Sequence, residues 1–422
     1  MILTARRVVI GLLIVSLAAA TMTGAPIYYR LTYLWGLLLF GSWLMSFIAL
    51  RGIRVQRKAR QLRSQVGYIF EERFEILNTS RLPRLWVEVR DESPLPGSRG
   101  SHVLTLIGGH ESRSYLSRTR LVERGVFPLG PTVLASGDLF GLFPVSRVRP
   151  SEDSLLVYPP MVDIRVFPNP PGLLPGGEAL RRRTPQITSN AAGVREYAPG
   201  DPLNRIHWVS TARRNRLIVK EFELDPLAEV WIFVDAARSV QVAMPYTYPE
   251  FDPQEIWKRR VHFELPPSTL EYSVSIAASL ARFYIQRGRS LGLVYAAQTL
   301  NVLPSDRGGR QLGKILEALA VLRGEGTLPL PALVESQARY LPRGSTVVLV
   351  TPNGSDLIYK TTDILLRRGL RPVAVLVDGA TFGGYISMDR LEASLRLLGI
   401  PVYRIHRSDD LAETLSTMVR GW

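Results

Sequence analysis

The sequence predicts a membrane-anchored, multidomain chain with a transmembrane helical hairpin, an all-β middle domain (a sandwich or small barrel) and a C-terminal α/β doubly wound domain. Three observations predict this class. Two apolar runs occupy residues 8–23 and 31–50, short apolar alternations continue to about residue 158, and near-continuous apolar strands alternate with helical patterns after residue 227. The expected regions are the anchor (1–64), the β domain (65–160), a connector with a signature segment (161–227) and the α/β domain (228–422).

The composition excludes several classes of protein. A chain of 422 residues that is 46% hydrophobic and 21% charged is neither a single small domain nor disordered. The absence of cysteine excludes disulfides, thiolate nucleophiles and cysteine-based metal sites. The net charge of +15 would suit nucleic acid or an anionic membrane, but residues 1–63 hold nine Arg and Lys and no acidic residue, which leaves +6 for the other 359. We therefore expect a phospholipid membrane as partner and no nucleic acid.

The two apolar runs predict the membrane anchor. The second run is uncharged for 20 residues, which is about the length that crosses a bilayer core. The first run is shorter and ends in Ala18-Ala19-Ala20, so a cleaved signal peptide is an alternative. Six basic residues lie between Arg51 and Arg63, against one (Arg30) just before the second run. The positive-inside rule then predicts a multi-pass protein of the inner (cytoplasmic) membrane, with a basic collar facing phospholipid and the bulk of the chain in the cytoplasm.

The middle of the chain contains short strand patterns separated by turn residues. They lie at 68–70, 85–89, 102–106, 115–116 and 126–129, a spacing typical of a sandwich or small barrel. The stretch 159–190 is rich in Pro and Gly, which indicates a surface connector.

The most distinctive segment runs from Gly193 to Phe222. It predicts a turn in which Asp201 accepts backbone N–H groups, a short helix over about 204–214 and a strand at 217–219. Its charged residues would either pin the segment between domains or form a recognition face. The candidate signature and interaction residues are Arg195, Glu196, Tyr197, Gly200, Asp201, Arg205, His207, Trp208, Arg213, Lys220 and Glu221.

This segment carries a family resemblance. The strings REYAPGD, RIHW, TAR and LIVKEF follow in order, and ERGVFPLGP and DLFGLF lie upstream. Together they resemble the bacterial and archaeal family called domain of unknown function 58. The resemblance implies a von Willebrand factor type A-like C-terminal domain and a MoxR-type AAA+ ATPase as partner. His207 stands where the family often has an aspartate, and Asn204 where an arginine is frequent, so we expect His207 to pack or hydrogen-bond rather than catalyse.

The C-terminal region predicts a mainly parallel sheet with helices on both faces. Ligands of such sheets bind at the carboxyl ends of the strands, which draws attention to Asp235. A type A metal site would show Asp-x-Ser-x-Ser, and here Asp235 and Ser239 flank Ala237 at the middle position. Thr351 could supply a further hydroxyl. We expect a degenerate metal site of Asp235, Ser239 and Thr351 with weak Mg²⁺ binding or none, and no other cofactor.

The expected strands are 229–234, 290–295, 346–350, 372–377 and 401–405, and the expected helices are 269–287, 309–323, 355–368, 388–398 and 411–419. Residues 241–267 form an insertion in the first crossover. The leading hypothesis is a non-enzymatic, membrane-anchored platform for protein partners, serving a cell-envelope or complex-assembly process with a MoxR-type ATPase. The alternative is a metal-assisted hydrolase with its active site near Asp201 and His207 or near Asp235.

Overall fold

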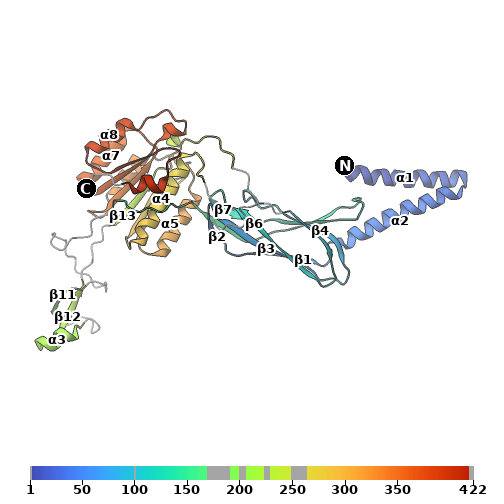
Figure 1. Cartoon of the computed structure of the whole chain (residues 1–422), viewed down its shortest axis with the longest axis horizontal. Coiled ribbons are helices and arrows are strands. Elements are labelled where there is room, and N and C mark those ends of the chain that lie inside the picture. Colours follow the sequence, from blue (N-terminus) through green and yellow to red (C-terminus); the bar gives the residue numbers. More distant parts are fainter. Residues whose placement is uncertain are drawn as a thin grey trace. The chain divides into compact units, whose positions relative to one another are not determined.

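The structure is a computed structural model that describes residues 2–98, 101–168, 191–198, 206–222, 229–248 and 264–417 (Figure 1). The chain forms two compact units, one of residues 1–160 with 247–264 and the other of residues 161–246 with 265–422. The two units are described separately below.

The first unit begins with two apolar helices, α1 (Ile2–Thr23) and α2 (Pro26–Ala49). They pack against each other, and the hydroxyl of Thr32 donates a hydrogen bond to that of Ser16 at 3.1 Å. Gly24, with φ of 65°, allows the sharp turn between them. Both helices are long and apolar enough to cross a membrane, judged by length and composition. The predicted pair of N-terminal helices is thus confirmed.

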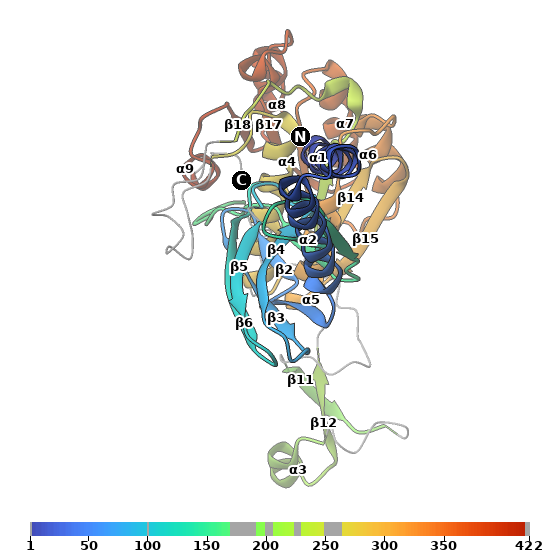
Figure 2. The ribbon, with the colours of Figure 1, turned by 90° about the vertical axis from the view of Figure 1, so that its right-hand side faces the viewer.

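The middle of the chain is rich in β structure, as predicted. Figure 2 shows β3 beside β6 and β4 beside β5. Three small sheets have the strand orders β1-β3-β6, β2-β10-β7 and β5-β4-β8-β9. The strands are β1 (Ile53–Ala59), β2 (Arg63–Gln65), β3 (Ile69–Asn78), β4 (Arg84–Asp91), β5 (His102–Ile107), β6 (Ser112–Arg120), β7 (Gly125–Pro128), β8 (Thr132–Ser136), β9 (Val145–Arg149) and β10 (Ser154–Tyr158).

Alternating side chains of these strands build two apolar cores. Phe74 of β3 and Val87 of β4 are fully buried in one core, which Leu50 at the end of α2 also joins. Phe70 of β3 and Leu155 of β10 belong to the other core. Burial of each such side chain stabilises the fold by about 1.5–3 kcal/mol, so the sheets and the end of α2 are held together as one unit.

The stretch after α2 differs from the sequence prediction, because β1 and β2 lie within the expected basic collar. The side chain of Arg57 on β1 is only 9% exposed, and its guanidinium contacts the carboxylates of Glu72 at 2.6 Å and Asp91 at 2.8 Å. Lys58 and Arg60 also form ion pairs, with Glu75 and Glu71 respectively. The expectation that Arg57 faces phospholipid is therefore wrong, since two carboxylates of the β sheets hold it inside the protein.

The second unit contains a mixed sheet of order β15-β14-β13-β16-β17-β18. All neighbours are parallel except β15, which runs antiparallel to β14. The strands are β13 (Val230–Val234), β14 (Leu291–Ala296), β15 (Leu300–Asp306), β16 (Thr346–Thr351), β17 (Arg371–Val377) and β18 (Val402–Ile405). The helices are α4 (Thr269–Gln286), α5 (Gly309–Val321), α6 (Leu330–Ala338), α7 (Asp356–Arg367), α8 (Asp389–Leu397) and α9 (Leu411–Ser416), with short 3-10 helices η2 (Arg238–Val240) and η4 (Gly379–Phe382).

Helices cover both faces of this sheet; in Figure 1, α7 and α8 lie above β13, and α4 and α5 lie to its right. Leu333 of α6, Leu365 of α7 and Leu391 of α8 share one core with the sheet. Helix α4 packs on β13, β14, β16 and β17 from the other side and also contacts α5. Near-continuous burial of both faces explains why β13, β14 and β16 are apolar at almost every position.

Candidate functional site

The first candidate region is the carboxyl edge of the mixed sheet. Four adjacent parallel strands end there in a polar residue, namely Asp235 after β13, Thr351 at the end of β16, Asp378 after β17 and His406 after β18. Parallel strands bring their carboxyl ends to the same edge, where open α/β sheets bind ligands. The sequence predicts the first two of these residues but has no motif that marks the other two.

Asp235 is buried and its two carboxylate oxygens are both engaged. One accepts a hydrogen bond from the Thr351 hydroxyl at 2.7 Å, and the other accepts from the Ala237 backbone N–H at 3.2 Å. Burial raises the pKa of Asp235 to about 6, which outweighs the opposing effect of these two hydrogen bonds. Ser239 lies exposed on η2. Among the residues that the structure describes, no cluster of three or more His, Cys, Asp or Glu could hold a metal ion.

The raised pKa predicts how stability changes with pH. Between about pH 4 and pH 6 the folded protein keeps a proton on Asp235 that the unfolded chain has lost, so stability should fall as pH rises through this window, by roughly 3 kcal/mol in total. Asp235→Asn should flatten that slope, because the amide is uncharged at both ends of the window. Thermal unfolding between pH 4 and pH 7 measures it, with the exposed Asp356→Asn as control. If the pH dependence of stability were unchanged in Asp235→Asn, the raised pKa of Asp235 would be contradicted.

A glycine loop closes over the edge next to Asp235. The Gly326 N–H donates to the Ala236 carbonyl at 2.9 Å, and the Arg238 N–H donates to the Gly326 carbonyl at 2.8 Å. A Cβ at Gly326 would collide with the carbonyl oxygens of Ala296 and Ala236. Only glycine fits so close to the backbone, and the loop therefore covers the strand ends that hold Asp235.

Arg404 of β18 organises the other end of the edge. Its guanidinium contacts the buried Asp378 at 2.5 Å, Asp389 at 2.6 Å and Glu392 at 3.1 Å. Burial alone would lower the pKa of Arg404, but the hydrogen bonds to these carboxylates outweigh it and raise the pKa above the usual range. His406 lies 3.7 Å from Asp378. The cluster is thus a neutralised network rather than a row of free acids.

The second candidate region is the signature segment, drawn with β11, β12 and α3 in Figure 1. Strand β11 (Ala191–Glu196) pairs antiparallel with β12 (Ile218–Phe222), and α3 (Trp208–Arg214) lies between them in sequence. The predicted short helix and the following strand are therefore present. The pairing of β11 with β12 brings the two halves of the signature segment together, with Arg195 opposite Val219. The other register pairs that hold predicted residues are Glu196 with Ile218, Val194 with Lys220 and Gly193 with Glu221. Gly200, Asp201 and Arg205 lie outside the described residues.

His207 is the N-cap of α3. Its Nδ1 accepts a hydrogen bond from the Ser210 backbone N–H at 3.3 Å and lies 2.6 Å from the Ser210 hydroxyl. The cap satisfies a backbone donor of the first turn, which stabilises a helix of only seven residues. The Ile218 N–H donates to the Thr211 hydroxyl at 3.0 Å and ties the helix to β12.

Apolar and basic side chains of this segment are exposed. Trp208 is 67% exposed and Val209 59%, and Arg213 is also exposed. Glu196 forms an ion pair with Arg216 at 2.9 Å, in which both side chains are well exposed. Tyr197 is tied to the strand pair by its backbone N–H, which donates to the Leu217 carbonyl at 2.8 Å. The segment therefore presents an exposed aromatic side chain at the start of a capped helix and basic residues in its last turn.

Comparisons with known proteins agree with the resemblance seen in the sequence. Residues 193–246 match the family described as "Protein of unknown function DUF58". The "Uncharacterized protein YeaD" of Bacillus subtilis (strain 168) is 23% identical over 209 residues, which are 50% of this chain and 46% of that protein. The chain thus aligns with a little under half of the length of that relative.

Two solved structures give only faint likenesses. An alkylpurine DNA glycosylase AlkC of Pseudomonas fluorescens has a TM-score of 0.17 at 10% identity, covering 33% of this chain and 42% of that chain. A beta-glucosidase from Listeria innocua has a TM-score of 0.15 at 8% identity, covering 25% and 16%. Likenesses this faint carry no argument. The match to the family of unknown function DUF58 covers residues 193–246, which contain the strings REYAPGD to LIVKEF that carry the resemblance.

Proposed function

We propose that this protein is a membrane-anchored adaptor whose signature segment docks a protein partner. In this proposal α1 and α2 cross the cytoplasmic membrane, the β sheets form a sandwich-like domain on the cytoplasmic side, and the second unit carries a von Willebrand factor type A-like domain. The family resemblance suggests a MoxR-type AAA+ ATPase as the partner. The observation that carries the proposal is the exposed Trp208 on a capped helix.

The physical argument concerns what an exposed tryptophan does on a rigid helix. Large exposed apolar side chains are expensive to leave in water, and tryptophan and arginine dominate the binding energy of protein interfaces. The His207 cap and the Thr211 hydrogen bond fix α3, so little conformational entropy would be lost on docking. Arg213 and Arg214 in its last turn favour a partner surface that combines an apolar pocket with acidic groups.

The carboxyl edge favours the adaptor over the hydrolase alternative. Both oxygens of Asp235 are engaged by Thr351 and Ala237, and the Gly326 loop lies over the same strand ends. A carboxylate held in this way acts as a structural brace of the edge.

The test is binding of a purified MoxR-type ATPase from the same organism to the full chain in nanodiscs. Trp208→Ser should weaken binding at least about tenfold, because truncation of a central aromatic removes more than about 1.4 kcal/mol, while unfolding stays unchanged. Leu397→Ser on α8 is the matched control, since Leu397 is 89% exposed and lies outside the signature. Equal binding by Trp208→Ser and the unaltered chain would exclude the docking role. Failure of the unaltered chain to bind would exclude this partner.

A further inference from the structure

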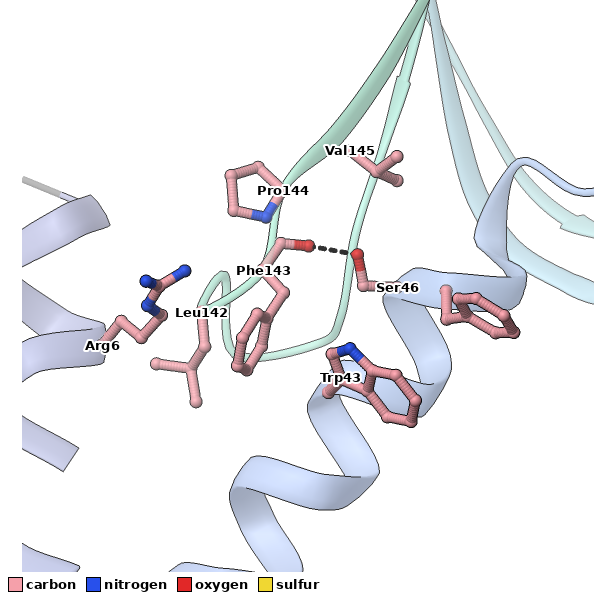
Figure 3. Close-up of a pocket in the computed structure, with 8 residues that line it drawn as sticks. Arg6, Trp43, Ser46, Leu142, Phe143, Pro144 and Val145 are labelled. Atoms are coloured by element: carbon pink, nitrogen blue, oxygen red, sulfur yellow. Dashed lines mark hydrogen bonds between the residues drawn. The ribbon is translucent and has the colours of Figure 1, made fainter. Parts of the chain in front are cut away.

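The loop between β8 and β9 reaches the ends of both N-terminal helices. The Ser46 hydroxyl of α2 donates a hydrogen bond to the Phe143 carbonyl at 2.6 Å. The guanidinium of Arg6 on α1 lies 5.5 Å from the centre of the Phe143 ring. Figure 3 shows Leu142 and Phe143 between Arg6 on one side and Trp43 on the other. The loop therefore occupies the space between the start of α1 and the end of α2.

The shape of this loop is fixed from inside. The buried carboxylate of Asp138 accepts hydrogen bonds from the backbone N–H groups of Phe140 at 3.0 Å, Leu142 at 3.1 Å and Phe143 at 2.7 Å. Leu142 is buried, whereas Leu139 is 65% exposed and Phe140 62% exposed. A loop held by three hydrogen bonds thus presents two large apolar side chains outward. These side chains are more stable in an apolar environment than in water.

The position of Ser46 sets the depth of the loop. Ser46 is three residues before Ala49, the last residue of α2, which corresponds to about 5 Å along the helix axis. In a bilayer crossed by α2, the Phe143 carbonyl is then at the boundary between headgroups and acyl chains. Trp43 and Phe47 lie at the same level, where aromatic side chains gather, and the Arg51 guanidinium sits 3.6 Å from the Phe47 ring centre.

We propose that residues Asp138–Phe143 form a membrane-docking loop that inserts Leu139 and Phe140 into the interface of the cytoplasmic leaflet. A cavity of about 440 Å³ beside Arg6 and Trp43 opens at this level and would receive phospholipid headgroups. Apolar insertion next to basic side chains is the combination that binds an anionic bilayer surface. This inference rests on the membrane anchoring proposed above, and it assigns the bilayer itself as the ligand of the loop.

Depth measurement with single cysteines tests the proposal, since the chain has no cysteine of its own. Phe140→Cys carries an environment-sensitive fluorophore in the full chain, reconstituted in nanodiscs of phosphatidylglycerol and phosphatidylcholine. Leu37→Cys, at a position 70% exposed in α2, marks the bilayer core. Val126→Cys, 51% exposed on β7, marks a sheet whose apolar core is separate from the one that Leu50 joins.

Phospholipids that carry a nitroxide near the headgroup should quench the Phe140 label at least about twofold more than the Val126 label. Iodide in the water should quench the Phe140 label less than the Val126 label. If the Leu37 label is quenched by lipid and the Phe140 label behaves like the Val126 label, the docking loop is excluded while the anchor stands. If the Leu37 label is not quenched by lipid, the anchor itself is wrong and the loop proposal falls with it.

Discussion

Arg57→Ala should lower the free energy of unfolding of the first unit by about 3–5 kcal/mol. The reason is that Glu72 and Asp91, whose side chains are both only 2% exposed, would face each other without the guanidinium that now binds both. Burial already raises the pKa of Glu72, and the hydrogen bond and charge of Arg57 oppose that rise. Removing Arg57 therefore leaves a carboxylate that is unstable in its ionised form.

The stability of Arg57→Ala should also depend on pH. Without Arg57 the pKa of Glu72 in the folded variant is raised further, so the variant takes up a proton when it folds. Its stability should therefore recover as pH falls towards about 4. Urea unfolding of the full chain in detergent measures the loss of unfolding free energy. Hydrogen exchange of peptides from β3 measures the same loss within the first unit. Lys58→Ala is the control, because Lys58 is 60% exposed in its pair with Glu75 and should contribute less than about 1 kcal/mol. Equal losses in the two variants would contradict the buried role of Arg57.

Arg404→Ala should have the second large effect, a loss of about 2–4 kcal/mol in the mixed sheet. The substitution leaves Asp378 buried without its guanidinium and frees Asp389 and Glu392 to repel each other. Arg404→Lys keeps the charge but not the planar fork, so it should recover only part of the loss.

Hydrogen exchange of peptides that contain β18 measures the effect of Arg404→Ala. Arg367→Ala is its control, since the Arg367 side chain is 78% exposed in its pair with Asp363 and surface pairs contribute little. A full recovery by Arg404→Lys would show that charge alone matters and that the forked geometry does not.

The sequence predicts most of the mixed sheet because its strands are buried on both faces. β13, β14 and β16 are apolar at nearly every position, and α5 buries one apolar face that includes Ile315, Leu316 and Leu319. Strand β15 was missed because it lies at the edge, where exposed and half-buried side chains alternate and Pro304 interrupts the pattern. Helix α6 has no clear signal in the sequence, because Pro329 and Pro331 flank its first residue, Leu330, and such a stretch resembles a loop.

Strand β1 shows a different limit of sequence interpretation. Its inward positions include Ile53 and Val55, but the next inward position is Arg57, so the alternation of apolar residues breaks there. Only the partners of Arg57, which lie on β3 and β4, make a buried cation acceptable. Those contacts join residues 15 and 34 positions apart, and no local pattern reveals them.

The candidate site was predictable to the extent that it follows from strand direction. Asp235 and Thr351 end neighbouring parallel strands, so the pattern alone brings them to one edge. Arg404 was missed because a single arginine in a short apolar strand has no signal until Asp378 is placed beside it. Trp208 was singled out in the sequence, but its exposure depends on the cap at His207 and on the pairing of β12.

The short path from α2 into β1 has a mechanical consequence. Helix α2 ends at Ala49 and β1 begins at Ile53, with Leu50 already buried in the β core. The Arg84 guanidinium also donates a hydrogen bond to the Arg51 carbonyl at 2.7 Å, so no flexible linker separates α2 from β1. A pull on the β sheets is therefore transmitted to α2 as tension and torque rather than absorbed by a linker. The helix and the sheets would therefore tilt together as one rigid body.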